Sequence, residues 1–302
     1  MADRKHKPLV QQVIVITGAS SGIGLATAEA AARQGAKLVL AARSTDTLKE
    51  IAARLAQENT GCEAIAVTAD VGKREDMQRV AVEAMTHYGR IDTWVNDAGV
   101  SIYGRLDEVS DEDSRRLFDT NFWGVVYGSL AALPQLRQTG GALINIGSEV
   151  SEAVIPLQGM YAASKHAVKG FTDALRIEIE ELDKALVTVT LIQPTAVDTP
   201  YPQHARNYMD REPKLPTPQI HPEDVAKAIL KAAVEGGRDI KVGAVAKLNT
   251  MTAKLAPSLG DKLSAKQAQR QQHDEPPRDP EGTLFKPGRS GRVHGEGGVA
   301  RH

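Results

Sequence analysis

The sequence predicts an α/β protein with a doubly wound, mostly parallel sheet of seven strands flanked by helices. Three observations predict this fold. Short apolar, β-branched runs alternate with helical stretches from residue 13 to about residue 242. A glycine-rich turn joins the first strand to the first helix, and polar residues follow several strands at their carboxyl ends, where such sheets bind ligands.

The elements follow in order along the chain. Gly89 and Gly236 suit helix ends, and Pro222 suits the first turn of a helix. Strands are expected at 13–16, 37–43, 63–69, 93–95, 141–146, 186–192 and 239–242. Helices are expected from the glycine turn to about 33, over 45–59, over 73–88, from 110 through 121, from 161 to about 182, and from 222 to 235.

Composition limits the class of protein. The chain has 302 residues, of which 41% are hydrophobic, so it can bury a core. The formal net charge of −1 shows no overall basicity, so we expect no nucleic-acid partner. Cys62 is the single cysteine, which excludes an internal disulfide. No apolar run approaches the ~18 residues of a membrane span, and no signal region is evident, so a cytoplasmic protein is expected.

The pattern divides the chain into three parts. Residues 1–9 are a polar lead, and residues 10–257 are expected to form one domain. The Pro-rich loop at about 199–221 follows the sixth strand and is expected to act as a lid over the site. Residues 258–302 form a polar, Pro- and Gly-rich tail, which is expected to be flexible or to lie over a neighbouring subunit.

The glycine-rich turn predicts a phosphate site. In the sequence Thr17-Gly18-Ala19-Ser20-Ser21-Gly22-Ile23-Gly24, Gly18 permits a tight turn and Gly22 lets a phosphate approach the backbone. Gly24 lets the helix pack closely on the strand. The helix then presents free N–H groups to an anion. Because a strand precedes the turn and a helix follows it, phosphate binding is favoured over a simple tight turn.

The end of the second strand indicates which dinucleotide binds. An acid at this point would bind the 2′-hydroxyl of the adenosine ribose and repel a 2′-phosphate. This chain instead has Ala42, Arg43 and Ser44, and an arginine can hold a phosphate through two hydrogen bonds. The sequence therefore favours NADP(H). The alternative is a solvated arginine at the end of a strand.

Tyr161 and Lys165 are four residues apart on a predicted helix, so their side chains are neighbours on one face. A nearby ammonium lowers the pKa of a phenol from about 10. Such a tyrosine can exchange a proton with an alcohol or a carbonyl oxygen near neutral pH. The alternative is a surface pair on an ordinary amphipathic helix. Asp70, at the end of the third strand, would hold an adenine amino group or cap the next helix.

Together these motifs resemble the short-chain dehydrogenase/reductase family over about residues 10–245, in the family's order, and the resemblance implies a Rossmann-like fold. The matching residues are Thr17-Gly18-x-x-x-Gly22-Ile23-Gly24, Asp70, Asn96-x-Ala98-Gly99, Asn121, Ser148, Tyr161-x-x-x-Lys165 and Pro194 to Thr199. Two residues depart from the pattern. Asp97 replaces the usual second Asn, which puts the local support of the sheet in doubt, and Thr195 replaces the usual Gly, so the following turn is expected to differ slightly.

The resemblance also implies roles. Tyr161 would be the general acid/base, Lys165 would lower its pKa and bind the nicotinamide ribose, and Ser148 would hold the substrate oxygen. Asn121 would interrupt its helix and hold a water for proton relay; without the resemblance, we interpret it as a buried amide that bonds to the backbone. The implied cofactor contacts are Gly18, Ser20, Ser21, Gly22, Ile23, Gly24, Arg43, Asp70, Val71, Asn96, Ala98, Gly99, Tyr161, Lys165, Pro194, Val197 and Thr199.

The sequence thus predicts an NADP(H)-dependent oxidoreductase that interconverts a largely apolar carbonyl compound and its alcohol by hydride transfer. One alternative is a non-catalytic dinucleotide-binding sensor or scaffold with the same fold. Another is an epimerase or dehydratase, which would need further acid/base groups. The resemblance implies a homodimer or homotetramer, and we expect no metal site.

Overall fold

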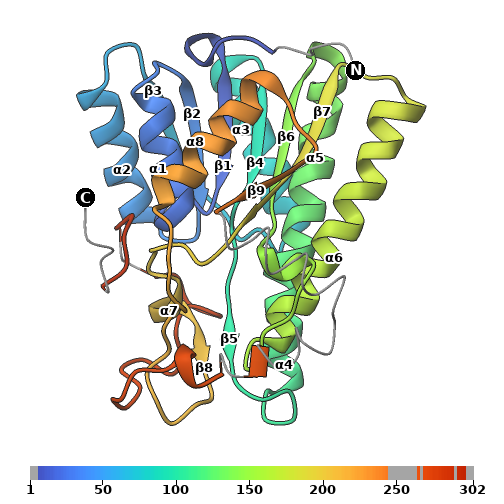
Figure 1. The fold of residues 1–302 in the computed structure, drawn as a ribbon. Coiled ribbons are helices and arrows are strands. Elements are labelled where there is room, and N and C mark those ends of the chain that lie inside the picture. The colour runs from blue at the N-terminus through green and yellow to red at the C-terminus, as the bar shows by residue number, and fades with distance from the viewer. Residues whose placement is uncertain (1–5, 244–263, 266–267, 289–290, 297–302) are drawn as a thin grey trace.

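The computed structural model describes residues 6–243, 264–265, 268–288 and 291–296. A parallel sheet of seven strands runs through it in the order β3-β2-β1-β4-β6-β7-β9 (Figure 1). The strands are β1 (Val13–Thr17), β2 (Lys37–Ala42), β3 (Glu63–Thr68), β4 (Thr93–Asn96), β6 (Gly141–Ile146), β7 (Val187–Pro194) and β9 (Asp239–Val242). Every neighbouring pair in this sheet is parallel, which confirms the predicted doubly wound fold.

Helices cover both faces of the sheet. One face packs on α1 (Gly22–Ala32), α2 (Thr45–Glu58) and α8 (Pro222–Glu235), and the other on α3 (Arg74–Tyr88), α5 (Gly124–Thr139) and α6 (Gly159–Arg176). Side chains of β1 alternate between the two cores: Ile14 and Ile16 enter the first, and Val13 and Val15 enter the second. This strand is buried on both faces, which explains its continuous apolar run.

The helix that contains Asn121 is interrupted. It begins as α4 (Asp111–Phe118), where the Ser110 side chain accepts from the Asp113 N–H at 3.1 Å. A π-helical turn spans Asp119–Trp123, and α5 continues from there. A π turn changes the i→i−4 hydrogen-bond pattern and is frequent at functional sites. The predicted interruption at Asn121 is therefore present.

A smaller unit lies beyond the carboxyl ends of the strands. The strands β5 (Ile102–Tyr103) and β8 (Arg206–Asn207) pair in parallel, and the short helix α7 (Tyr201–His204) precedes β8 (Figure 1). These elements belong to the predicted lid at 199–221 and its neighbours. No helix among the described residues is both long and apolar enough to cross a membrane.

Part of the C-terminal tail packs on its own chain. Asn207 N donates to Pro280 O at 2.9 Å, and Thr283 N donates to His204 O at 2.8 Å. Tail residues Pro280 and Thr283 therefore bond to the loop at 199–221, while the expected flexibility of the tail or its contact with a neighbour stays a prediction. The other tail residues, including 258–263, lie outside the described residues. We call residues 283–288 and 291–296 the C-terminal segment.

Candidate active site

A single cleft at the carboxyl ends of the strands collects most of the predicted site residues. It runs from the glycine turn and Arg43 to Tyr161 and Lys165. The predicted residues that line it are Gly18, Ser20, Ser21, Gly22, Ile23, Arg43, Asp70, Val71, Ala98, Gly99, Ser148, Tyr161, Lys165, Pro194, Val197 and Thr199. Gly24 and Asn96, which were predicted to contact the cofactor, and Asn121, which was predicted to hold a water, do not line this cleft.

The glycine turn has the geometry of a phosphate cradle. Gly18 and Gly22 have φ angles of +72° and +55°, which favour glycine. A Cβ on Gly18 would lie 2.8 Å from the Ala98 backbone, and one on Gly24 would lie 2.5 Å from Gly18 O. Gly24 thus serves close helix–strand packing, as its position predicted, rather than ligand contact. The N-terminus of α1 faces the cleft, so the residues present fit a dinucleotide pyrophosphate.

Arg43 lies at the adenosine end of the cleft, next to a second arginine. Its Nη1 and Nη2 donate to Leu284 O at 3.1 Å and Thr283 O at 2.5 Å. Burial and the charge of Arg116 lower the pKa of Arg43. The predicted alternative of a solvated arginine is therefore wrong. Two bonds occupy only part of the five N–H donors of a guanidinium, which leaves donors for a phosphate.

Asp70 lies beside Arg116 and does not cap a helix. Its Oδ1 accepts from Gly72 N at 3.0 Å and its Oδ2 accepts from Arg116 Nη2 at 2.7 Å. Burial opposes its ionisation, but the hydrogen bond and charge of Arg116 prevail, so the pKa of Asp70 lies below its usual value. Helix α3 begins after Lys73, and no side chain caps it. The capping alternative for Asp70 is therefore wrong, while an adenine contact stays a prediction.

The side chains of Asn96 and Asp97 point in different directions, and Asn96 does not face the cleft as predicted. Asn96 points away from the cleft: its Nδ2 donates to Asn145 Oδ1 at 2.9 Å and its Oδ1 accepts from Trp94 Nε1 at 2.8 Å. It therefore supports the sheet, and the substitution at Asp97 leaves that support intact. Asp97 is half-buried on the cleft side, and its carboxylate lies close to Gly24.

Thr195 fits its position without strain. Its N–H donates to Val242 O at 3.1 Å, which extends the pairing of β7 with β9. Among the described residues that are not glycine, only Leu157 and Lys184 have positive φ angles. The threonine therefore causes no backbone strain in the turn that leads to Val197 and Thr199.

The Asn121 side chain is satisfied by protein groups. Its Oδ1 accepts from Val100 N at 2.8 Å, and its Nδ2 donates to Val100 O at 2.9 Å and Ser164 Oγ at 3.1 Å. Asn121 is therefore a buried amide that bonds to the backbone, which is the alternative interpretation of this residue. Its role in the site is to fix the strand end at Val100 next to the cleft. A relay water at this turn stays a prediction.

Tyr161, Ser148 and Lys165 meet at the other end of the cleft. Burial raises the pKa of Tyr161 to about 12, although hydrogen bonds with Tyr201 and Ser148 lower it. The Lys165 Nζ lies 5.7 Å from the centre of the Tyr161 ring and donates to Ile146 O at 2.8 Å. Because burial is the largest influence on this phenol, its pKa is raised and the predicted lowering is absent.

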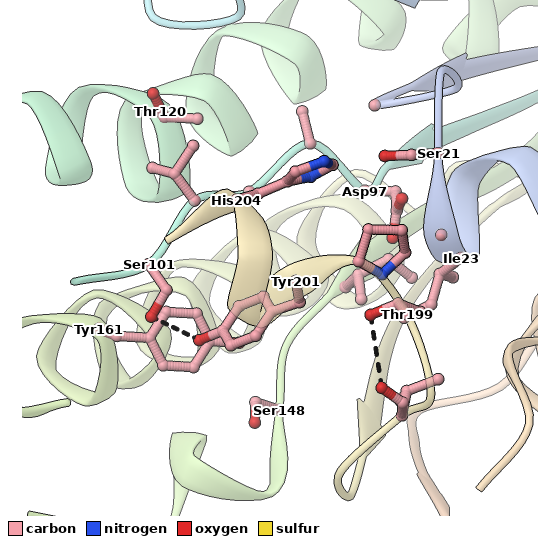
Figure 2. A pocket seen from close by; sticks show the side chains of 18 of the residues that line it. Ser21, Ile23, Asp97, Ser101, Thr120, Ser148, Tyr161, Thr199, Tyr201 and His204 are labelled. Atoms are coloured by element: carbon pink, nitrogen blue, oxygen red, sulfur yellow. Dashed lines mark hydrogen bonds between the residues drawn. The ribbon is translucent and has the colours of Figure 1, made fainter. Parts of the chain in front are cut away.

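Tyr201 is a site residue whose role the sequence did not reveal. Its ring lies 5.5 Å from that of Tyr161, edge to face, and both project into the same pocket (Figure 2). Its hydroxyl bonds to Ser101 Oγ at 2.7 Å and Gln158 Oε1 at 2.8 Å. A tyrosine in a Pro-rich loop gives no signal of this contact. Because Tyr201 begins α7, the loop at 199–221 contacts the candidate acid/base, while its opening and closing as a lid stays a prediction.

Asp97 adds a titratable group next to Lys165. Burial raises the pKa of Asp97 to about 7, against the opposing effects of Lys165 and the Gly24 N–H. Burial also lowers the pKa of Lys165 to about 8, and the charge of Asp97 opposes this shift. The Asp97 charge further raises the pKa of Tyr161. The Asp97 carboxylate therefore acts on the pKa of both residues in the same direction, although burial is the larger influence on each.

We expect Asp97→Asn to move the pH profile of alcohol oxidation toward lower pH by about one unit. Without the negative charge, the pKa values of Tyr161 and Lys165 both fall, so proton acceptance begins at lower pH and the ammonium is also lost at lower pH. The profile of kcat/KM checks this, with Asp107→Asn, an exposed residue, as control. An unchanged profile in Asp97→Asn would show that Asp97 does not act on this pair.

Comparison with known proteins decides the family. A family model described as short chain dehydrogenase matches residues 12–210. The chain belongs to this family. It is 47% identical over 289 residues to the "Uncharacterized oxidoreductase YxnA" of Bacillus subtilis, covering 94% of this chain and 80% of that protein. It is 36% identical over 233 residues to "11-beta-hydroxysteroid dehydrogenase A" of Sesamum indicum, covering 75% and 67%.

Two solved structures of this family resemble the chain. An alcohol dehydrogenase from Thermococcus sibiricus, complexed with 5-hydroxy-NADP, has a TM-score of 0.66 and 32% identity, covering 76% of this chain and 94% of that one. A short chain dehydrogenase/reductase from Burkholderia phymatum, in complex with NAD, has a TM-score of 0.74 and 28% identity, covering 86% and 96%. As a member of the short-chain dehydrogenases, the chain is an oxidoreductase.

Proposed function

We propose that this short-chain dehydrogenase reduces a carbonyl compound with NADPH, and oxidises the alcohol in reverse, with Tyr161 as general acid/base. One observation carries the proposal: Tyr161, Ser148 and Lys165 line the same cleft that the glycine turn opens into. The related structures hold an NADP derivative and NAD, which supports a nicotinamide dinucleotide in this cleft.

The residues would act on the substrate oxygen. A bound NADPH would supply the hydride for the carbonyl carbon and become NADP⁺. Tyr161 gives its phenolic proton to the oxygen as the C–O double bond becomes single, and Ser148 holds that oxygen by a hydrogen bond. Lys165 remains close to the phenolate that forms, and its ammonium stabilises the negative charge. The reverse reaction returns the proton to Tyr161.

The proposed preference for NADP(H) rests on the charged residues at the end of the cleft that would hold the adenosine of the cofactor. Arg43 and Arg116 supply two positive charges there, and the last residues of β2 are alanines, with no acid to repel a 2′-phosphate. Asp70, the acid whose charge acts on Arg43, is paired with Arg116 at 2.7 Å. These charges favour a cofactor with the extra phosphate.

The substrate is proposed to be largely apolar. Val100, Val150, Ile155, Leu215 and Pro216 line the cleft. Apolar walls favour an apolar ligand, and the few hydroxyls orient its oxygen. Because a relative from Sesamum indicum carries the name 11-beta-hydroxysteroid dehydrogenase, a steroid ketone belongs among the compounds to be tested.

The test is the oxidation of NADPH in the presence of ketones, aldehydes and a steroid ketone, followed by product identification. The proposal expects turnover of at least one apolar carbonyl compound and formation of its alcohol. NADPH binding without turnover of any compound would contradict it and favour a sensor that keeps the fold. Ser148, Tyr161 and Lys165 all line the cleft, which argues against that sensor.

We further propose a homodimer or homotetramer. Trp123, Leu130 and Ile177 are large apolar residues that are 42%, 42% and 52% exposed, on or next to the long helices α5 and α6. Exposed apolar side chains on these two helices favour contact with another chain. Light scattering of the purified protein gives the oligomeric state, and a monomer at micromolar concentration would contradict the proposal.

A further inference from the structure

Three metal-ligand side chains meet beside the cofactor cleft. His221 precedes α8, Glu223 lies in its first turn, and His294 belongs to the C-terminal segment. One ligand atom from each lies within 4.8 Å of the others. The proposed hydride transfer uses none of them. The sequence predicted no metal site, because His294 is 71 residues from Glu223 and no spacing motif joins them.

The His294 ring faces a carboxylate on each side. Its Nδ1 lies 3.1 Å from Asp198 Oδ2, and its Nε2 lies 2.9 Å from Glu223 Oε1. A neutral imidazole has one N–H and one lone pair, so it can donate to only one carboxylate. The nitrogen facing the other carboxylate needs a cation, which is either a second proton or a metal ion.

The surrounding groups favour the metal ion. A histidine that ligates a metal usually donates its other ring N–H to a carboxylate, and Asp198, only 4% exposed, is placed to accept it. The His221 ring lies 6.2 Å from the His294 ring, centre to centre, at 77°. A proton shared between His294 and the carboxylates would not require this second imidazole. Two imidazoles and a carboxylate form a typical donor set for Zn²⁺.

We propose that His221, Glu223 and His294 bind a divalent transition-metal ion of the zinc class, with Asp198 orienting His294. The positive ion offsets the two carboxylates that flank the ring. The Glu223 side chain is 50% exposed, so the ion can enter from solvent. The site is structural in effect, because it joins α8 to the C-terminal segment.

The metal would fasten the C-terminal segment across the cofactor cleft. On one side of His294, Arg292 O accepts from Gly22 N in the glycine turn at 3.0 Å. On the other side, Gly295 packs so closely that a Cβ there would lie 2.7 Å from Thr199 O. The segment therefore touches both the phosphate turn and the proposed nicotinamide segment. This consequence rests on the proposed function, whereas metal binding itself does not.

The first experiment measures Zn²⁺ binding to the metal-free, full-length protein by calorimetry, with metal content measured independently. We expect a single zinc ion per chain. Its affinity should fall at least tenfold in His221→Ala and His294→Ala, and roughly 10–100-fold in Asp198→Asn. The matched control is His87→Ala, whose ring pairs with Glu83 on α3 without a second histidine. That variant should bind zinc as the wild type does.

Equal zinc affinity in the wild type and His294→Ala, or no zinc binding by the wild type, would overturn the proposal and assign the cation on His294 to a proton. Glu223→Gln keeps the size of the side chain at a half-exposed position, so we expect this variant to fold. Its zinc affinity should be reduced, and this measurement tests the site even if a histidine variant fails to fold. Thermal unfolding with zinc adds a second measure, because an ion that binds only the folded chain raises Tm.

The second experiment measures the release rate of NADPH with and without zinc. Zinc should slow release in the wild type and have no effect in His294→Ala. If zinc does not change the rate of NADPH release from the wild type, the proposal that the metal fastens the C-terminal segment across the cleft is wrong. If no nucleotide binds at all, the proposed function fails, and the zinc titration still decides the metal site.

Discussion

Replacing Tyr161 by phenylalanine is expected to reduce kcat about 10²–10⁴-fold, while NADPH affinity changes by less than about twofold. The variant keeps the ring, which packs against Tyr201 and lies under the Lys165 ammonium, and loses only the hydroxyl that exchanges the proton. Steady-state kinetics gives kcat, and fluorescence titration gives the cofactor affinity.

The matched control is Tyr127→Phe, a partly buried tyrosine that stacks on Trp123 far from the cleft. It should keep both quantities. Tyr201→Phe is a second useful variant, since the Tyr201 hydroxyl bonds to Ser101 and Gln158 and its ring packs against that of Tyr161. Full activity in Tyr161→Phe would show that another group exchanges the proton, and a large loss in Tyr201→Phe alone would point to that residue.

Replacing Arg43 by aspartate is expected to weaken NADPH binding about a hundredfold or more and to strengthen NADH binding. Two charged hydrogen bonds to a phosphate contribute ~1.5–3 kcal/mol each, and ~1.4 kcal/mol corresponds to a factor of ten. The new carboxylate would repel the 2′-phosphate and accept a hydrogen bond from the 2′-hydroxyl of NADH. Titration with both cofactors measures the change.

Two further variants separate the possible causes. Arg43→Ala should lose NADPH affinity without gaining NADH affinity, and Arg105→Asp, on an exposed loop, should keep the wild-type preference. Arg43 also holds the carbonyls of Thr283 and Leu284, so its loss could loosen the C-terminal segment. Loosening would weaken both cofactors equally. An unchanged ratio of NADPH to NADH affinity in Arg43→Asp would rule out Arg43 as the phosphate ligand.

The order of strands and helices could be predicted because each signal is local. The continuous apolar run of β1 follows from burial on both faces, and the positive φ angles of Gly18 and Gly22 follow from the glycine pattern itself. The four-residue spacing of Tyr161 and Lys165 correctly placed the two side chains together. Local patterns of this kind do not depend on what the rest of the chain does.

The direction of a side chain at a strand end could not be predicted. Successive residues of a strand point to opposite faces, so Asn96 and Asp97 separate, one toward α5 and one toward the cleft. The sequence does not say which takes which side. The pKa of Tyr161 is a similar case, because it depends on how deeply the lid and neighbouring residues bury the phenol.

The position of the C-terminal segment could not be predicted from the sequence either. Its contacts with Arg43 and with the Gly22 N–H are made by the backbone carbonyls of Thr283, Leu284 and Arg292. Any residue type can supply a carbonyl, so no side-chain pattern predicts such contacts. The contacts of His294 with Glu223 and Asp198 are different, because they are made by side chains. They could not be predicted either, because the three residues are far apart in the sequence.

A titration of the purified protein with NADPH and NADH under identical conditions tests most directly whether this cleft binds NADP(H) for hydride transfer. We expect saturable binding of one dinucleotide per chain, with an affinity for NADPH at least about tenfold above that for NADH. Equal affinity, or a preference for NADH, would contradict the assignment of Arg43. Binding of neither cofactor would contradict the assignment of the glycine turn, and with it the proposed reaction.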